Sequence, residues 1–156
     1  MNFRLHALPS APFQPLFELD EAGLAALGAR RMTADAPHSA PCRISLADAA
    51  PGERLILISH RHLDIPASPY RGEGPIFVRE AAVEATPAPG AVPDMLARRL
   101  LSARIYDRDW MMVDADLVGG GDVAERLEAW FGDPAAAAIH LHTARRGCFM
   151  AAATRA

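Results

Sequence analysis

The sequence has no lysine: all 16 of its basic residues are arginines. The missing amine excludes enzymes that form a Schiff base on lysine, including those that hold pyridoxal phosphate, and it excludes phosphate-binding loops of the Walker A type. Aromatic residues make up only 6% of the chain, too few for a platform on which nucleic-acid bases stack. Function classes that depend on a lysine amine or on many aromatic rings are therefore ruled out first.

Cysteines are also few, and the net charge is small. The two cysteines, Cys42 and Cys148, form no Cys-x-x-Cys or zinc-ribbon motif. No run approaches the roughly 18 apolar residues of a membrane span, and the first residues lack the apolar core of a signal peptide. We therefore expect a cytoplasmic protein with reduced thiols. The formal net charge of -3 argues against nucleic-acid and membrane partners, and we predict neither.

The composition is typical of a folded globular protein, since 51% of the 156 residues are hydrophobic and 22% are charged. Twelve of the 13 prolines precede residue 94, so the first half should consist of strands and turns. We predict a single α+β domain over residues 1–156, a mostly antiparallel sheet with about three short helices that cover one face. Residues 81–93, rich in Ala and Pro, are expected to form an exposed connection.

Hydrophobic periodicity sets the expected elements. Alternating or continuous apolar residues predict strands at 3–8, 30–34, 42–46, 55–58 with a polar continuation to 62, 76–79, 103–106, 111–118, 138–142 and 148–153. Apolar residues at helical spacing predict helices that begin at Asp20, Asp94 and Asp122. The second is expected to span residues 94–102. The third should begin with a capping box formed by Asp122 and Glu125.

Several short motifs follow one another along the chain. They are Pro41-Cys42-Arg43, Ser68-Pro69-Tyr70-Arg71, Gly74-Pro75-Ile76-Phe77-Val78-Arg79, and His140-Leu141-His142 followed by Gly147-Cys148. Together they resemble a bacterial family known as domain of unknown function number 1203, over nearly the whole chain. The resemblance implies no activity, cofactor or partner, so the function has to be argued from the residues.

The leading hypothesis is a pocket for a small anionic ligand. Arg43, Arg71 and Arg79 supply guanidinium groups, which bind carboxylate and phosphate through two parallel hydrogen bonds. His140 and His142 are two residues apart on a predicted strand, so both imidazoles face the same way and would complete the pocket. In the competing interpretation the arginines only hold loops by pairing with acidic neighbours.

An enzyme is the alternative from another class. A hairpin between predicted strands 138–142 and 148–153 would bring Cys148 near His142, and an imidazole beside a thiol can generate a nucleophilic thiolate. Cys148 and His142 are therefore the predicted catalytic pair. The competing interpretation is a small buried cysteine without reactivity, which is the commoner fate of a free thiol.

A metal site is a second enzymatic alternative. His140 and His142 resemble half of a zinc or iron site, which Asp114 and Asp116 would complete if their strand lies alongside. A further His-x-His pair occupies residues 60–62. Because this spacing is undemanding, the sequence assigns no metal ligand and no cofactor.

The third hypothesis is an interaction module. Such a protein would form a homodimer through an edge strand or through the face that carries Trp130, because aromatic residues are enriched at interfaces.

Overall fold

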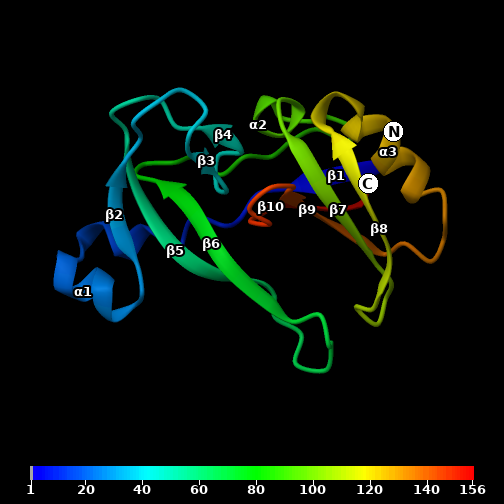
Figure 1. The fold of residues 1–156 in the computed structure, drawn as a ribbon, viewed down its shortest axis with the longest axis horizontal. Coiled ribbons are helices and arrows are strands. Elements are labelled where there is room, and N and C mark those ends of the chain that lie inside the picture. Colours follow the sequence, from blue (N-terminus) through cyan, green and yellow to red (C-terminus); the bar gives the residue numbers. More distant parts are fainter. Residues whose placement is uncertain (1) are drawn as a thin grey trace.

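The strands form two five-stranded sheets that lie side by side (Figure 1). The computed structural model describes residues 2–156. Sheet A has the order β1 (Phe3–His6), β10 (Phe149–Arg155), β9 (Ala138–Thr143), β7 (Leu100–Tyr106) and β8 (Met112–Gly119). Sheet B has the order β2 (Arg30–Thr33), β5 (Arg54–Leu63), β6 (Gly72–Arg79), β3 (Pro41–Cys42) and β4 (Ala47–Asp48).

Strand pairing is antiparallel throughout the two sheets except between β3 and β6. The predicted α+β class and mostly antiparallel pairing are confirmed. The strands are divided between two sheets, however, where the sequence analysis expected one. Periodicity within a segment says which residues share a face, but it does not say which strands become neighbours.

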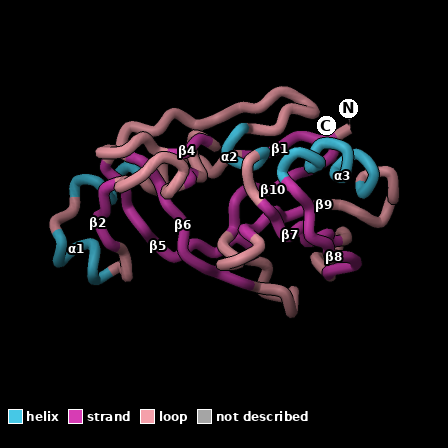
Figure 2. Tube along the Cα trace, turned by 45° about the horizontal axis from the view of Figure 1, so that its top comes forward, coloured by secondary structure: helices cyan, strands magenta, loops and turns pink. Residues whose placement is uncertain are grey.

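Short helices cover one face of sheet A (Figure 2). They are α2 (Asp94–Ala97), the 3-10 turn η2 (Gly120–Asp122) and α3 (Val123–Trp130). α3 buries Val123 and Leu127, and Phe131 directly after its end continues the same four-residue spacing, so the three side chains form one stripe. This stripe packs against alternate residues of the strands, among them Ile139 and Leu141 of β9. Within residues 2–156, no helix has the length and apolar character needed to cross a membrane.

The core of sheet B is separate. α1 (Glu21–Ala26) and the 3-10 helix η1 (Gln14–Glu18) contribute Leu24 and Leu16 to it, and β5 contributes Ile56. β5 and β6 form a long hairpin, and only the first half of β5 is buried in this core. The second half is polar and reaches sheet A, where the centroid of the His62 ring lies 4.8 Å from that of His142.

Three local predictions are wrong. Residues 42–46 do not continue as a strand, since β3 ends at Cys42 and Leu46 has a φ of 48° in the turn that follows. The predicted helix 94–102 ends after four residues, because β7 begins at Leu100 and pairs with strands on both sides. Two rows of backbone hydrogen bonds outweigh a weak local preference for helix. The capping box is absent as well, because Asp122 makes no side-chain cap hydrogen bond.

Residues 81–93 connect β6 to α2 without a helix or strand. The backbone N–H of Ala85 donates to the carbonyl of Ile44, and that of Gly90 donates to the carbonyl of Phe3. The connection therefore contacts both halves of the molecule.

The two surfaces predicted for a homodimer are an edge strand and the face with Trp130. The edge strand β8 of sheet A exposes Val113 and Leu117, and the guanidinium of Arg126 covers the Trp130 ring. The homodimer stays a prediction.

Gly120 lies at the closest approach between α2 and η2. A Cβ at residue 120 would lie 2.2 Å from the carbonyl oxygen of Leu96 and 2.4 Å from that of Ala97, both of them backbone atoms. We expect Gly120→Ala to lower the free energy of unfolding by roughly 2–4 kcal/mol in urea titrations, because the backbone must shift. Gly121→Ala is the matched control, since a Cβ there meets nothing within 4 Å. Equal urea midpoints for the two variants would contradict this packing.

Candidate metal centre

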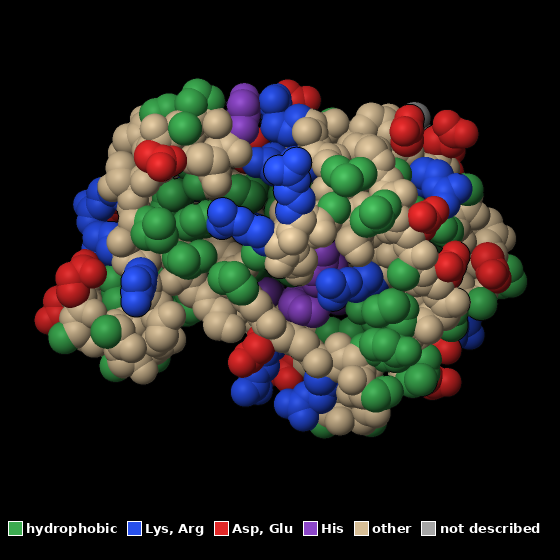
Figure 3. Space-filling model, in the orientation of Figure 1, with side chains coloured by type: hydrophobic (Ala, Val, Ile, Leu, Met, Phe, Trp, Pro, Cys, Tyr) green, Lys and Arg blue, Asp and Glu red, His purple; other side chains and the backbone are tan. Residues whose placement is uncertain are grey.

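Three histidine side chains meet where the far end of β5 reaches sheet A. His62 comes from β5, and His140 and His142 come from β9. Each offers a ring nitrogen, and these nitrogens all lie within 4.8 Å of one another. The His62 and His140 ring centroids are 5.9 Å apart. Figure 3 shows histidine side chains in the hollow at the middle of this face, beside arginine side chains. We call this group the three-histidine cluster.

Strand alternation places two of the three imidazoles. Ile139 and Leu141 of β9 face the helices, so His140 and His142 face the opposite side of sheet A. Both imidazoles are nevertheless buried, because the β5–β6 hairpin and the ring of Phe149 cover them. The polar face of β9 thus becomes an interior surface.

His62 reaches the cluster through an irregularity of its strand. The pairing of β5 with β6 shifts between Arg61 and Leu63, which makes His62 the extra residue of a β-bulge. A bulge re-aims the side chain of its extra residue. Gly72, on β6, provides the space: a Cβ there would lie 3.1 Å from two atoms of the His62 ring. The Phe149 ring stacks on the same imidazole at 5.6 Å between centroids.

The hydrogen bonds of the cluster leave ring nitrogens unused. His142 Nδ1 lies 2.9 Å from the Gly147 carbonyl oxygen, which only accepts, so Nδ1 carries the proton and Nε2 has a free lone pair. His142 Nε2 is buried without a partner, and so are Nδ1 of His140 and Nδ1 of His62. Buried polar atoms without a partner are rare and call for an explanation. A metal ion would bind the Nε2 lone pair of His142 and the unprotonated ring nitrogen of each of the other two imidazoles. The bond to Gly147 is the outer contact typical of a metal-binding histidine.

Electrostatics keep the cluster neutral. Burial lowers the pKa of His140 to about 4 and that of His142 to about 3, and the positive charge of Arg104 acts in the same direction. Burial also lowers the pKa of His62. The imidazoles are therefore unprotonated at neutral pH, which is the state that binds metals.

Arg104 is a charged neighbour that the sequence analysis missed. It lies directly opposite His140 in the pairing of β7 with β9, so the two side chains share a face. Among residues 2–156, no carboxylate forms an ion pair with it. The cluster thus places three neutral imidazoles beside an arginine whose side chain hydrogen-bonds that of Tyr106 but has no carboxylate partner among residues 2–156. A guanidinium without a carboxylate partner favours an anion nearby.

The carboxylates proposed from sequence as additional ligands point elsewhere. Asp116 lies opposite Ala103, a residue of the helix-side core, and Asp114 shares that face. Asp116 pairs with Arg126 of α3 at 2.7 Å. His62, and not a carboxylate, is the third member of the cluster. Repetition of the His-x-His pattern at residues 60–62 was the only signal for it in the sequence.

The predicted catalytic pair is adjacent in the hairpin but not joined through its side chains. The Cys148 backbone N–H donates to Thr143 Oγ1. His142 directs Nδ1 at Gly147 and leaves Nε2 without a partner, so neither ring nitrogen bonds to the Cys148 sulfur. Cys148 instead lines a separate cavity together with Arg43.

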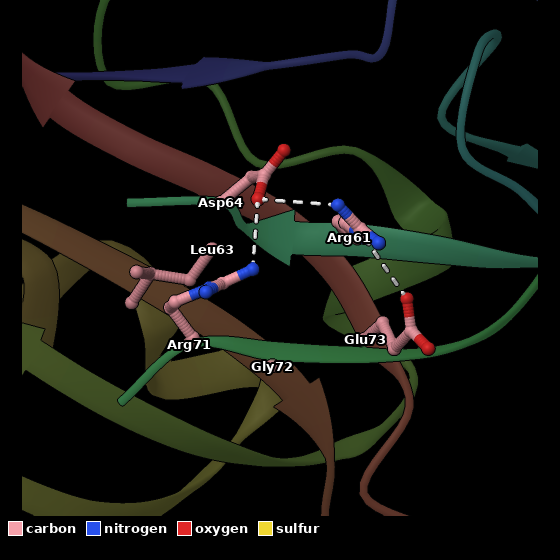
Figure 4. A pocket seen from close by; sticks show the side chains of 6 residues that line it. All are labelled: Arg61, Leu63, Asp64, Arg71, Gly72 and Glu73. Carbon is pink, nitrogen blue, oxygen red and sulfur yellow. Dashed lines mark hydrogen bonds and ion pairs between the residues drawn. The ribbon is translucent and has the colours of Figure 1, made fainter. Parts of the chain in front are cut away.

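The predicted arginine ligands occupy three separate places. Arg71 forms an ion pair with Asp64 at 3.8 Å and lines a small cavity at the tip of the β5–β6 hairpin (Figure 4). Arg79 pairs with Glu53 at 2.8 Å, at the opposite end of β6. Only Arg43 is buried, and its Nε donates to the carbonyl of Phe149. The structure does not gather these guanidinium groups around His140 and His142.

Comparison with known proteins gives a family but no function. A family model described as a protein of unknown function (DUF1203) matches residues 39–155, which include the three-histidine cluster, Arg43, Arg104 and Cys148. No curated protein and no solved structure gives a match. Because the matched segment is most of the chain, and because it carries the motifs noted in the sequence, this protein belongs to the DUF1203 family.

Proposed function

We propose that this protein binds a divalent transition metal ion through His62, His140 and His142. The observation that carries the proposal is the convergence of three ring nitrogens within 4.8 Å, with a buried, unpartnered nitrogen on each imidazole. Imidazole ligands without carboxylates favour ions such as Zn²⁺, Cu²⁺ or Ni²⁺ over Mg²⁺ and Ca²⁺. Three protein ligands also leave a zinc ion one open position.

The open position gives the metal a role in ligand binding. Arg104 shares the face of His140 and has no carboxylate partner among residues 2–156, so it favours an anion as the fourth ligand. This keeps the small-anion hypothesis but moves its site: the anion is held by a metal ion and Arg104, in place of Arg71 and Arg79. A bound water would be the ligand in the absence of such an anion, and a metal ion makes that water more acidic.

Metal content of the protein purified without a histidine tag tests the proposal. After incubation with Zn²⁺ and removal of excess metal, we expect about one equivalent by elemental analysis, because residues 2–156 contain one such cluster. His62→Ala should lose most of the bound metal, since two protein ligands hold zinc poorly. His62 is only partly buried, so this variant should fold.

His60→Ala is the matched control, because His60 lies on the same strand but outside the cluster. It should bind as much metal as the unaltered protein. Less than about a tenth of an equivalent in the unaltered protein, or equal loss in both variants, would rule out this metal site.

A further inference from the structure

A second site is lined by the turn between β9 and β10 and by sheet B, and it includes none of the histidines of the three-histidine cluster. It is a cavity of about 660 Å³ between the two sheets, within the range of small-molecule sites. Met32, Leu57 and Phe77 of sheet B contribute an apolar wall, and Arg43 and Arg146 face the same space. Figure 3 shows apolar side chains gathered in a hollow next to arginine side chains. We call this space the Arg43 cavity.

Arg43 is a buried cation without a counter-ion. The residue is only 2% exposed, and no carboxylate among residues 2–156 forms an ion pair with it. Nε donates to the carbonyl of Phe149 and Nη1 to the carbonyl of Pro41, and both acceptors are neutral. A buried charge is costly unless it is paired, so the arrangement is incomplete as it stands.

Neighbouring groups do not supply the missing negative charge. Asp48 is the carboxylate whose charge acts on Arg43, but it already forms ion pairs with Arg99 at 2.7 Å and with His38 at 3.1 Å. The other groups that act on Arg43 include Cys42 and Cys148, which are free cysteines and not carboxylates. Arg146, at the exposed rim of the cavity, has no ion-pair partner among the described residues either. Two guanidinium groups are thus available to one ligand.

We propose that the Arg43 cavity binds a small monocarboxylate, with its carboxylate between Arg43 and Arg146 and its apolar body against Leu57 and Phe77. A guanidinium offers parallel N–H groups that match the two oxygens of a carboxylate. The apolar wall selects against inorganic anions, which have no body to bury. This site is independent of the metal centre. The Arg43 cavity requires an anion with an apolar chain, whereas the anion proposed beside the metal and Arg104 needs none.

Binding of hexanoate to metal-free protein tests the proposal by calorimetry. We expect saturable binding of one hexanoate, with an affinity at least about tenfold above that for hexanol or for inorganic phosphate. Arg146→Ala should weaken hexanoate binding about tenfold, since a hydrogen bond to a charged group is lost. Arg145→Ala is the matched control, because that arginine does not line the Arg43 cavity and is exposed like Arg146.

Alkylation of Cys148 gives a second readout without any variant. Cys42 is fully buried, so iodoacetamide should label Cys148, which lines the cavity. Bound hexanoate is expected to slow this labelling at least about threefold, whereas phosphate should not. The proposal is overturned by the absence of saturable hexanoate binding up to about 10 mM, by hexanol binding as tightly, or by equal effects of the Arg145 and Arg146 variants.

Discussion

Addition of Zn²⁺ to the metal-free protein is expected to raise the midpoint of thermal unfolding by roughly 8–16 °C. A ligand that binds only the folded state, at 1,000 times its dissociation constant, stabilises that state by about 4.1 kcal/mol. Each kcal/mol shifts the midpoint by about 2–4 °C for a chain of this size. The effect should be large here because His140 Nδ1 and His142 Nε2 are buried without hydrogen-bond partners in the metal-free protein. A bound metal ion would supply the missing partner. Differential scanning calorimetry with and without a chelator measures the shift.

Two comparisons separate this effect from non-specific binding of metal. His62→Ala should lose most of the shift, whereas His60→Ala should keep it, because only His62 belongs to the three-histidine cluster. Mg²⁺ should stabilise neither variant, since it prefers oxygen ligands in octahedral geometry. A shift of the same size in the His62 variant, or with Mg²⁺, would show that the metal binds elsewhere.

The positions of most strands could be predicted from periodicity, whereas the division into two sheets could not. Segments 103–106 and 111–118 alternate clearly and are joined by a tight turn, and the structure pairs them as β7 and β8. The stretch 94–102 shows a helical spacing of leucines, yet its last three residues belong to β7, which pairs with β9. That pairing joins residues about forty positions apart, and a local pattern contains no information on it.

The candidate site was also predictable only where it depends on local periodicity. That His140 and His142 share a face follows from the two-residue period of a strand. The arrival of His62 depends on a β-bulge and on the space left by Gly72, and neither can be read from residues 59–63 alone. The sequence predicts Arg43 as a ligand-binding residue, but its burial beside the β9–β10 hairpin depends on the distant hydrogen bond from its Nε to the carbonyl of Phe149.

Acidification of the metal-free protein from pH 6.5 to pH 4 is expected to remove roughly 4–6 kcal/mol from its free energy of unfolding. The pKa of His140 is lowered to about 4 and that of His142 to about 3, mainly by burial, against 6.5 for an exposed imidazole. Over this pH range the unfolded chain therefore binds protons that the folded chain does not, so stability is complete above about pH 6.5 and falls as the pH decreases.

Urea unfolding between pH 6.5 and pH 5 measures this dependence where most carboxylates are still ionised. We expect a slope approaching about 2.5 kcal/mol per pH unit, since two protons are taken up on unfolding at about 1.4 kcal/mol each. The variant His140→Asn, checked for native circular dichroism at pH 7.5, should lose about half of this slope because one titrating imidazole is gone. A stability that does not change between pH 6.5 and pH 5 would mean that the two imidazoles are hydrated in solution. The buried nitrogen lone pairs on which the metal centre depends would then not exist.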